Sequence, residues 1–312
     1  MVSFVASIPS PPGNGISLGP IDLRAYGFLI ALGVLAGVWL TSRRLARDGL
    51  DPEIIPNMAL WVLPAAIVGA RLYFVLTNWG RFADDPGAAF RLWEGGLGIP
   101  GGVALGAAVG VWWLRREQVP LPPVFTAVAL GLPLGQIIGR FGNWFNQELY
   151  GRPTDLPWGL EIDPDHRLRG YESSELFHPT FAYEILWNIA LLALLVWLDR
   201  KRVLKPGALF AAYLIGYGVG RIIIETVRID PVNSLFGIRL HIWAMIVFIA
   251  AAVVYLVRGG RARTPEEAAW PPASEDDRAA EQPAGEGPTG DDDGPVGSAA
   301  TDLAGAQAGD ET

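Results

Sequence analysis

The sequence predicts an all-α, polytopic integral membrane protein with about seven transmembrane helices. Half of the 312 residues are apolar, the mean hydropathy is positive, and charged residues make up only 18% of the chain. Apolar segments of roughly 17–25 residues are long enough to cross a hydrocarbon core about 30 Å thick. Such segments lie at 24–42, 55–77, 97–114, 121–139, 179–198, 206–227 and 240–257.

Basic residues in the connections predict the orientation, because cytoplasmic loops carry an excess of Lys and Arg. These residues follow the first, third, fifth and seventh segments and are Arg43, Arg44, Arg47, Arg115, Arg116, Arg200, Lys201, Arg202, Lys205, Arg258, Arg261 and Arg263. We therefore expect the N-terminus outside and the C-terminus in the cytoplasm. No removable signal peptide is expected before the first segment.

The composition changes abruptly near residue 264 and predicts two regions. Residues 1–263 form the transmembrane body, whose segment at roughly 140–178 is long enough for a small external cap. Residues 264–312 contain thirteen acidic residues and only Arg278 as a basic one. Such a tail is expected to be disordered and cytoplasmic. A solvating role is favoured over binding of a partner.

The chain contains no cysteine, and its histidines are few. Disulfides, thiolate ligands and a cysteine nucleophile are therefore excluded. The three histidines, His166, His178 and His241, have no metal-ligand spacing. We expect no metal, no cofactor and no nucleic-acid partner.

Residues 139–151, with the sequence GRFGNWFNQELYG, combine glycines with polar side chains directly after the fourth apolar segment. The polar groups of interest are Arg140, Asn143, Asn146 and Glu148, while Gly139, Gly142 and Gly151 leave the backbone open for the close approach of a ligand. Guanidinium and amide groups beside a lipid leaflet are suited to holding phosphate. The run therefore predicts a phosphate site on the external side of the membrane.

Charged residues within the apolar segments or at their edges are expected to face the interior of the helix bundle or a water-filled cavity, because each costs about 2.5–3.5 kcal/mol on insertion scales when it faces lipid. They are Arg71, His178, Glu184, Arg221, Glu225 and Arg228. The last three are spaced four and three residues apart, so they share one helix face, and Glu225 can pair with either arginine. This pattern fits a structural ion-pair ladder and fits a site for a lipid phosphate about equally well.

Two tyrosines and a glycine cluster have ordinary explanations beside functional ones. Tyr26 and Tyr217 lie at comparable outer depth, where single tyrosines are common belt residues. The glycines around Pro100, within 95–106, are typical of close helix packing. Contact of their backbone amides with a lipid headgroup is the alternative.

These motifs resemble those of the bacterial prolipoprotein diacylglyceryl transferase family. The 139–151 run looks like that family's signature, Gly-Arg-x-Gly-Asn-x-x-Asn-x-Glu-x-x-Gly. The likeness extends to Tyr26-Gly27, to Gly69-Ala-Arg71, to 178–184 and to 216–228, and so covers about residues 20–257.

The resemblance implies transfer of the diacylglyceryl group from phosphatidylglycerol to the lipobox cysteine of a preprolipoprotein, the first step of lipoprotein maturation. It also implies a multi-pass protein of the bacterial plasma membrane that binds signal peptides and has its active site on the outer side. The residues that match the family's catalytic positions are Arg140, Arg221, Glu148, Tyr26 and Tyr217. Those expected to bind phosphatidylglycerol are Arg140, Asn143, Asn146, Gly151, Arg221 and Glu225.

One departure from the family concerns the catalytic base. The family commonly has a histidine followed by two glycines, whereas this chain has Pro100-Gly101-Gly102. Either the base differs here or the histidine is not obligatory. We favour arginines that lower the pKa of the substrate thiol, with Glu148 or a tyrosine as the proton acceptor.

Three other classes of membrane protein fit these residues less well. A retinal receptor needs a lysine in a span, but Lys201 and Lys205 lie in a connection. An anion transporter, the strongest rival, would have polar groups in both halves of the bilayer, whereas here they gather on the outer side. A lipid phosphatase would usually show a histidine nucleophile or a metal-binding carboxylate cluster, and the sequence contains neither pattern.

Overall fold

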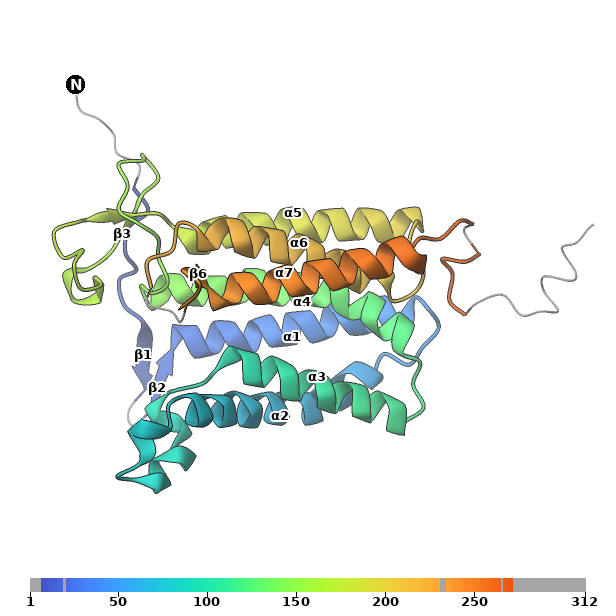
Figure 1. Ribbon diagram of the computed structural model, residues 1–312, viewed down its shortest axis with the longest axis horizontal. Helices are drawn as coiled ribbons and strands as arrows, with labels where there is room; N and C mark the ends of the chain where they lie inside the picture. The colour runs from blue at the N-terminus through green and yellow to red at the C-terminus, as the bar shows by residue number, and fades with distance from the viewer. Residues whose placement is uncertain (1–6, 19–20, 231–233, 265, 272–312) are drawn as a thin grey trace, which may run out of the picture. The chain divides into compact units, whose positions relative to one another are not determined.

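In the described part of the chain, seven α-helices lie side by side (Figure 1). The structure is a computed structural model that describes residues 7–18, 21–230, 234–264 and 266–271. The helices are α1 (Ala25–Ala46), α2 (Ile54–Thr77), α3 (Ile99–Arg116), α4 (Leu121–Phe145), α5 (Thr180–Lys201), α6 (Ala208–Glu225) and α7 (Leu240–Tyr255). Most of the predicted tail lies outside the described residues.

Six of the described helices are long and apolar enough to cross a membrane. They are α1, α2, α4, α5, α6 and the stretch His241–Gly260, which joins α7 to a short π-helical turn at Leu256–Gly260. The third predicted segment is helical as α3 but is not among the six. Four glycines and the terminal pair Arg115 and Arg116 dilute its apolar side chains. The structure thus supports a polytopic, helical membrane protein with six candidate spans.

The fourth predicted segment ends in the wrong place. It was expected to stop at residue 139, but α4 continues through the first half of the signature to Phe145. The amide of Asn146 still donates to the carbonyl oxygen of Gly142 at 3.0 Å. No proline interrupts residues 139–145, and so nothing there prevents continuation of the helix.

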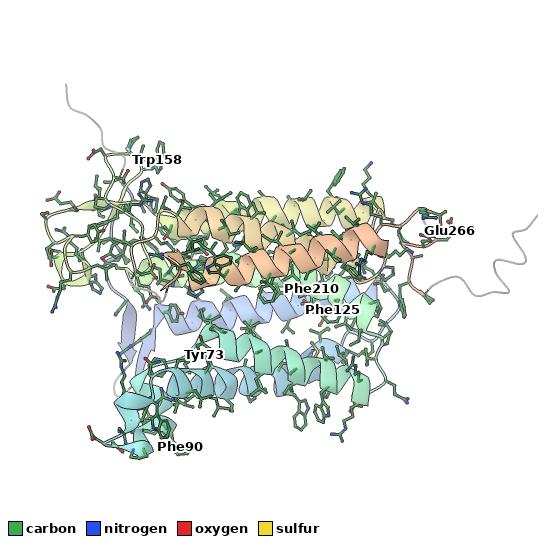
Figure 2. All side chains as sticks on the ribbon, viewed as in Figure 1. Tyr73, Phe90, Phe125, Trp158, Phe210 and Glu266 are labelled. Carbon is green, nitrogen blue, oxygen red and sulfur yellow. The ribbon has the colours of Figure 1, made fainter. Side chains whose placement is uncertain are left out.

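Three short antiparallel strand pairs, which the sequence did not predict, lie at one end of the helices (Figure 1). They are β1 (Gly15–Leu18) with β2 (Ile21–Arg24), β3 (Leu160–Glu161) with β4 (Leu176–Phe177), and β5 (Ser234–Leu235) with β6 (Ile238–Arg239). We call this the strand end, and we call the opposite end, which carries residues 256–264 and 266–271, the tail end. In Figure 2, Phe90 and Trp158 lie at the strand end and Glu266 at the tail end.

Glycines allow the helices to approach closely. A Cβ atom at Gly131 of α4 would lie 2.0 Å from Thr41 Oγ1 and 2.6 Å from the carbonyl oxygen of Gly37, both on α1. Between α2 and α3, a Cβ at Gly101 would lie 2.2 Å from the carbonyl oxygen of Gly69. The packing interpretation of the glycines near Pro100 is therefore supported.

Arg71 of α2 holds the segment that connects α2 to α3. The residue is 7% exposed, and its guanidinium donates to five backbone carbonyls. The acceptors are the carbonyl oxygens of Ala88, Ala89, Arg91, Gly95 and Gly96. This segment contains the 3-10 turns Trp79–Phe82, Pro86–Phe90 and Leu92–Glu94. The buried charge of Arg71 is thus used for local structure.

The segment between α4 and α5 has its own small core at the strand end. Tyr150, Leu160, Ile162, Phe177 and Phe181 are buried together. The N-terminal segment joins this core, because Ile8 exchanges backbone hydrogen bonds with Gly159 and Glu161 at 2.9 Å. The packed segment covers the end of α4 that carries the signature.

Candidate functional site

Two arginines from different helices share one buried carboxylate near the strand end. Arg140 lies in α4, Glu184 in the second turn of α5, and Arg221 near the end of α6. Arg140 Nη2 is 2.5 Å from Glu184 Oε2, and Arg221 Nη1 is 3.2 Å from Glu184 Oε1. The exposed side-chain fraction is 5% for Glu184, 12% for Arg221 and 21% for Arg140. The two arginines singled out in the sequence are therefore neighbours, and Arg140 is the more accessible.

Glu225 extends this cluster along α6. Its side chain is fully buried, and it forms ion pairs of 2.6 Å with Arg221 Nη2 and 2.7 Å with Arg239 Nη1. Arg228 is farther away, at 3.9 Å. Of the two partners expected for Glu225, Arg221 is the close one. The second close partner is Arg239, which precedes α7.

Arg228 pairs mainly with Asp230, at 2.7 Å. Burial raises the pKa of Asp230, but the hydrogen bond from Arg228 and the charges of Arg228 and Arg239 outweigh burial and hold that pKa below its usual range. The connected charges are the cations Arg140, Arg221, Arg228 and Arg239 and the anions Glu184, Glu225 and Asp230. One positive charge is left over, so the cluster can attract an anion.

A line of hydrogen bonds connects Arg140 with the rest of the signature. Arg140 Nη1 donates to Asn143 Oδ1 at 3.1 Å, one turn along α4. Asn143 Nδ2 donates to Glu148 Oε1 at 2.8 Å, and Asn146 Nδ2 donates to the same oxygen at 3.3 Å. The polar residues of the motif thus form one network that orients Glu148.

Gln147 fastens the signature to the segment that follows it. Its Nε2 donates to Asp163 Oδ2 at 2.6 Å, and its Oε1 accepts from the Asp163 amide at 2.8 Å. Gln147 and Leu149 both have positive φ, of 50° and 60°. Hydrogen bonds from Gln147 and Ser10 lower the pKa of Asp163. The turn after α4 is therefore held by side chains rather than by glycines.

Two signature glycines make room for protein groups. A Cβ atom at Gly142 would lie 2.8 Å from Cδ2 of Tyr26, whose phenol is within electrostatic reach of Glu148 and Arg140. A Cβ atom at Gly151 would lie 2.8 Å from the Cβ of His178. These glycines therefore let Tyr26 and the start of α5 approach the arginine cluster.

Tyr217 lies one turn before Arg221 on α6, on its tail-end side. Its ring stacks on that of Tyr213, with centroids 5.7 Å apart and an interplanar angle of 20°. The hydroxyl of Tyr213 accepts a hydrogen bond of 2.9 Å from Gln136 Nε2. Tyr217 thus belongs to an aromatic layer next to the charged cluster.

Sequence reasoning underestimated two members of the cluster. Glu184 was noted as a charged residue in a span but was not assigned to the site, although a carboxylate there needs a cationic partner. Arg239 lies in a connection between two apolar segments, and the sequence predicts no role for it. Its pairing with Glu225 joins residues fourteen apart across a connection, and no local pattern indicates it.

Apolar helices around a buried cluster of arginines and carboxylates define a multi-pass membrane protein with a charged site at one end. A family model described as prolipoprotein diacylglyceryl transferase matches residues 14–258. The chain belongs to that family of membrane transferases, as the resemblance of its motifs predicted.

Relatives from several bacteria carry the same family name. Phosphatidylglycerol–prolipoprotein diacylglyceryl transferase 2 of Streptomyces coelicolor is 48% identical over 257 residues, which cover 81% of this chain and 81% of the relative. The transferase of Streptomyces griseus is 45% identical, over 84% and 81% of the two chains. That of Corynebacterium efficiens is 43% identical, over 85% and 87%. The similarity thus extends over nearly the whole helical body.

Proposed function

We propose that this chain transfers the diacylglyceryl group of phosphatidylglycerol to the cysteine thiol of a preprolipoprotein. The single observation that carries the proposal is the pairing of Arg140 and Arg221 on one carboxylate, because two guanidinium groups at that spacing suit a phosphate. The names of the relatives support this substrate pair.

The proposed reaction is a displacement at carbon. The substrate sulfur forms a bond to the glycerol carbon of the diacylglyceryl group, while the bond from that carbon to the phosphate oxygen breaks. Glycerol phosphate leaves with the electron pair, and the thiol proton passes to a base. Since negative charge grows on the leaving oxygen, Arg140 and Arg221 would stabilise the transition state more than the bound lipid.

The proton acceptor is proposed to be Glu148 or a tyrosine. Pro100 stands where the family commonly has histidine, so the proton acceptor is sought among the other residues near the arginines. Glu148 is held by neutral amide donors from Asn143 and Asn146 and lies near Tyr26. A carboxylate with neutral donors accepts a proton more readily than one paired with arginine. Tyr217 is the more remote candidate.

The remaining signature residues are proposed to bind and orient the lipid. Asn143 and Asn146 would hydrogen-bond the headgroup. Glu225 would hold the guanidinium of Arg221 in position through their ion pair. Gly151 would contribute through its backbone, which pairs with Arg228. The lipid would enter laterally from the bilayer, between two helices. The signal peptide of the protein substrate would lie in the bilayer beside the helices.

We also propose that the protein lies in the bacterial plasma membrane with the strand end outward. All seven helices would span the bilayer, with α3 as the least apolar. This orientation puts the basic residues that follow α1, α3, α5 and α7 in the cytoplasm, in line with the usual bias. The segment 140–178 would then be the external cap.

The proposed activity is tested with purified protein, phosphatidylglycerol and a lipobox peptide. Mass spectrometry should detect a peptide that carries one thioether-linked diacylglyceryl group. Phosphatidylcholine should give no adduct, R140Q should give little, and R200Q, an exposed arginine at the tail end, should match the unmodified protein. Absence of the adduct while a known transferase forms it under the same conditions would overturn the proposal in favour of an anion transporter.

A further inference from the structure

Glu184 occupies the position in which the proposed phosphate would bind. One carboxylate oxygen is paired with Arg140 and the other with Arg221. The second Nη atom of Arg140 donates to Asn143, and the second Nη atom of Arg221 is paired with Glu225. Both arginines are thus already engaged before any lipid binds. A phosphate must replace one of these partners.

We propose that Glu184 is an internal anion that the phosphate of phosphatidylglycerol displaces from Arg140. This inference rests on the proposed function. Arg140 is the partner to be given up, because its side chain is 21% exposed while that of Arg221 is 12% exposed and held by two carboxylates. A carboxylate and a phosphate compete for the same guanidinium donors.

A second arginine is ready to receive the displaced carboxylate. Glu184 Oε1 is 3.2 Å from Arg221 and 3.9 Å from Nη1 of Arg228. Glu184 Oε1 therefore has two cationic neighbours besides Arg140, which contacts the other oxygen, Oε2. This exchange of Glu184 for phosphate on Arg140 leaves no buried charge without a partner. A buried charge without a partner would be strongly unfavourable.

The exchange has consequences for positioning and selectivity. Without lipid, Glu184 holds Arg140 and Arg221 close together despite their mutual repulsion. When lipid binds, an anionic headgroup replaces the negative charge that Arg140 loses. A zwitterionic headgroup brings its own cation and replaces that charge poorly. Glu184 is therefore a positioning residue that favours anionic lipids over zwitterionic ones. Because it competes with the phosphate for Arg140, it also lowers the affinity for phosphatidylglycerol.

The first test compares E184Q with D199N. Glutamine keeps the size and an acceptor oxygen but removes the competing charge, so E184Q should lower the KM for phosphatidylglycerol by about fivefold or more, as for other coupled binding events. Inhibition by free glycerol phosphate should strengthen similarly, and kcat should fall because product leaves more slowly. D199N removes a carboxylate from Arg44 at the tail end and should leave KM unchanged. An unchanged or higher KM for E184Q would overturn the inference.

A second measurement uses the unmodified protein in case E184Q does not fold. In nanodiscs with carboxyl-labelled glutamate, addition of phosphatidylglycerol should shift a carboxylate stretching band, whereas phosphatidylcholine should not. The shifting band should be missing from E184D, whose carboxylate at this position carries no label. No shift, or a shift that persists in E184D, would contradict displacement of Glu184.

The two proposals fail in different ways. If no thioether adduct forms, the proposed function is wrong, and if the adduct forms equally well with R140Q, the proposed role of Arg140 is wrong. If the adduct forms and depends on Arg140, but E184Q binds phosphatidylglycerol no more tightly, only the role of Glu184 is wrong.

Discussion

Arg221 contacts two different carboxylates through its two Nη atoms, Glu184 at 3.2 Å and Glu225 at 2.6 Å. A lysine at this position offers one compact ammonium and cannot reproduce the planar fork. We expect R221K to lower kcat for lipid transfer by about 10²-fold or more, the range seen when one transition-state donor is lost. The control is R200K at the exposed tail end, which should retain full activity. Equal rates for the two variants would show that a point charge suffices.

We expect His178 to make folding sensitive to mild acid. Burial and, to a lesser degree, the charge of Arg152 lower the pKa of His178, whose Nδ1 is 3.0 Å from the hydroxyl of Tyr183. The unfolded chain therefore binds a proton more readily, and stability should fall as the pH drops through about 6.5. The lowered pKa values of Asp163 and Asp230 act only below about pH 4.

This contribution is measured by thermal unfolding between neutral and mildly acidic pH. The melting temperature should fall with pH in the unmodified protein and should fall less in H178N. The control H166N changes an exposed histidine of the same segment and should follow the unmodified protein. Parallel curves for H178N and H166N would contradict the assignment.

At the scale of elements, α1 and α4 are in contact through glycines, and the same two helices place Tyr26 next to Gly142. A methyl group at Gly131 would collide with Thr41 Oγ1 and with the backbone of Gly37. We expect G131A to destabilise the protein by about 1–3 kcal/mol, the usual cost of overpacking. The control is G27A in α1, where nothing lies within 4 Å of the added methyl. A melting temperature for G131A equal to that of G27A would show that the helices can separate without cost.

Helix positions and helix ends differ in how well the sequence predicts them. Hydropathy located each helical segment, since an apolar stretch of sufficient length is a local property. It failed at the end of α4, because polar residues of the signature continue the helix when a packed segment covers them. It also gave no indication of the strand pairs, whose members are two to four residues long.

At the scale of the whole molecule, the absence of cysteine makes the proposed orientation directly testable. A single cysteine introduced at exposed Ser173, at the strand end, should react with an impermeant maleimide in intact cells. One introduced at exposed Lys201, at the other end of α5, should react only after lysis. Measurement is by gel shift of the labelled protein. The reverse pattern would mean that the strand end faces the cytoplasm.

The sequence by itself determined the membrane class, the helical segments, the signature and the family. These follow from composition, from hydrophobic length and from the spacing of residues within one segment. Only the tertiary structure decided that Glu184 joins Arg140 to Arg221, that Arg239 pairs with Glu225, and that Gly142 accommodates Tyr26. Such contacts depend on the relative height and rotation of packed helices, which the residues of one helix do not specify alone.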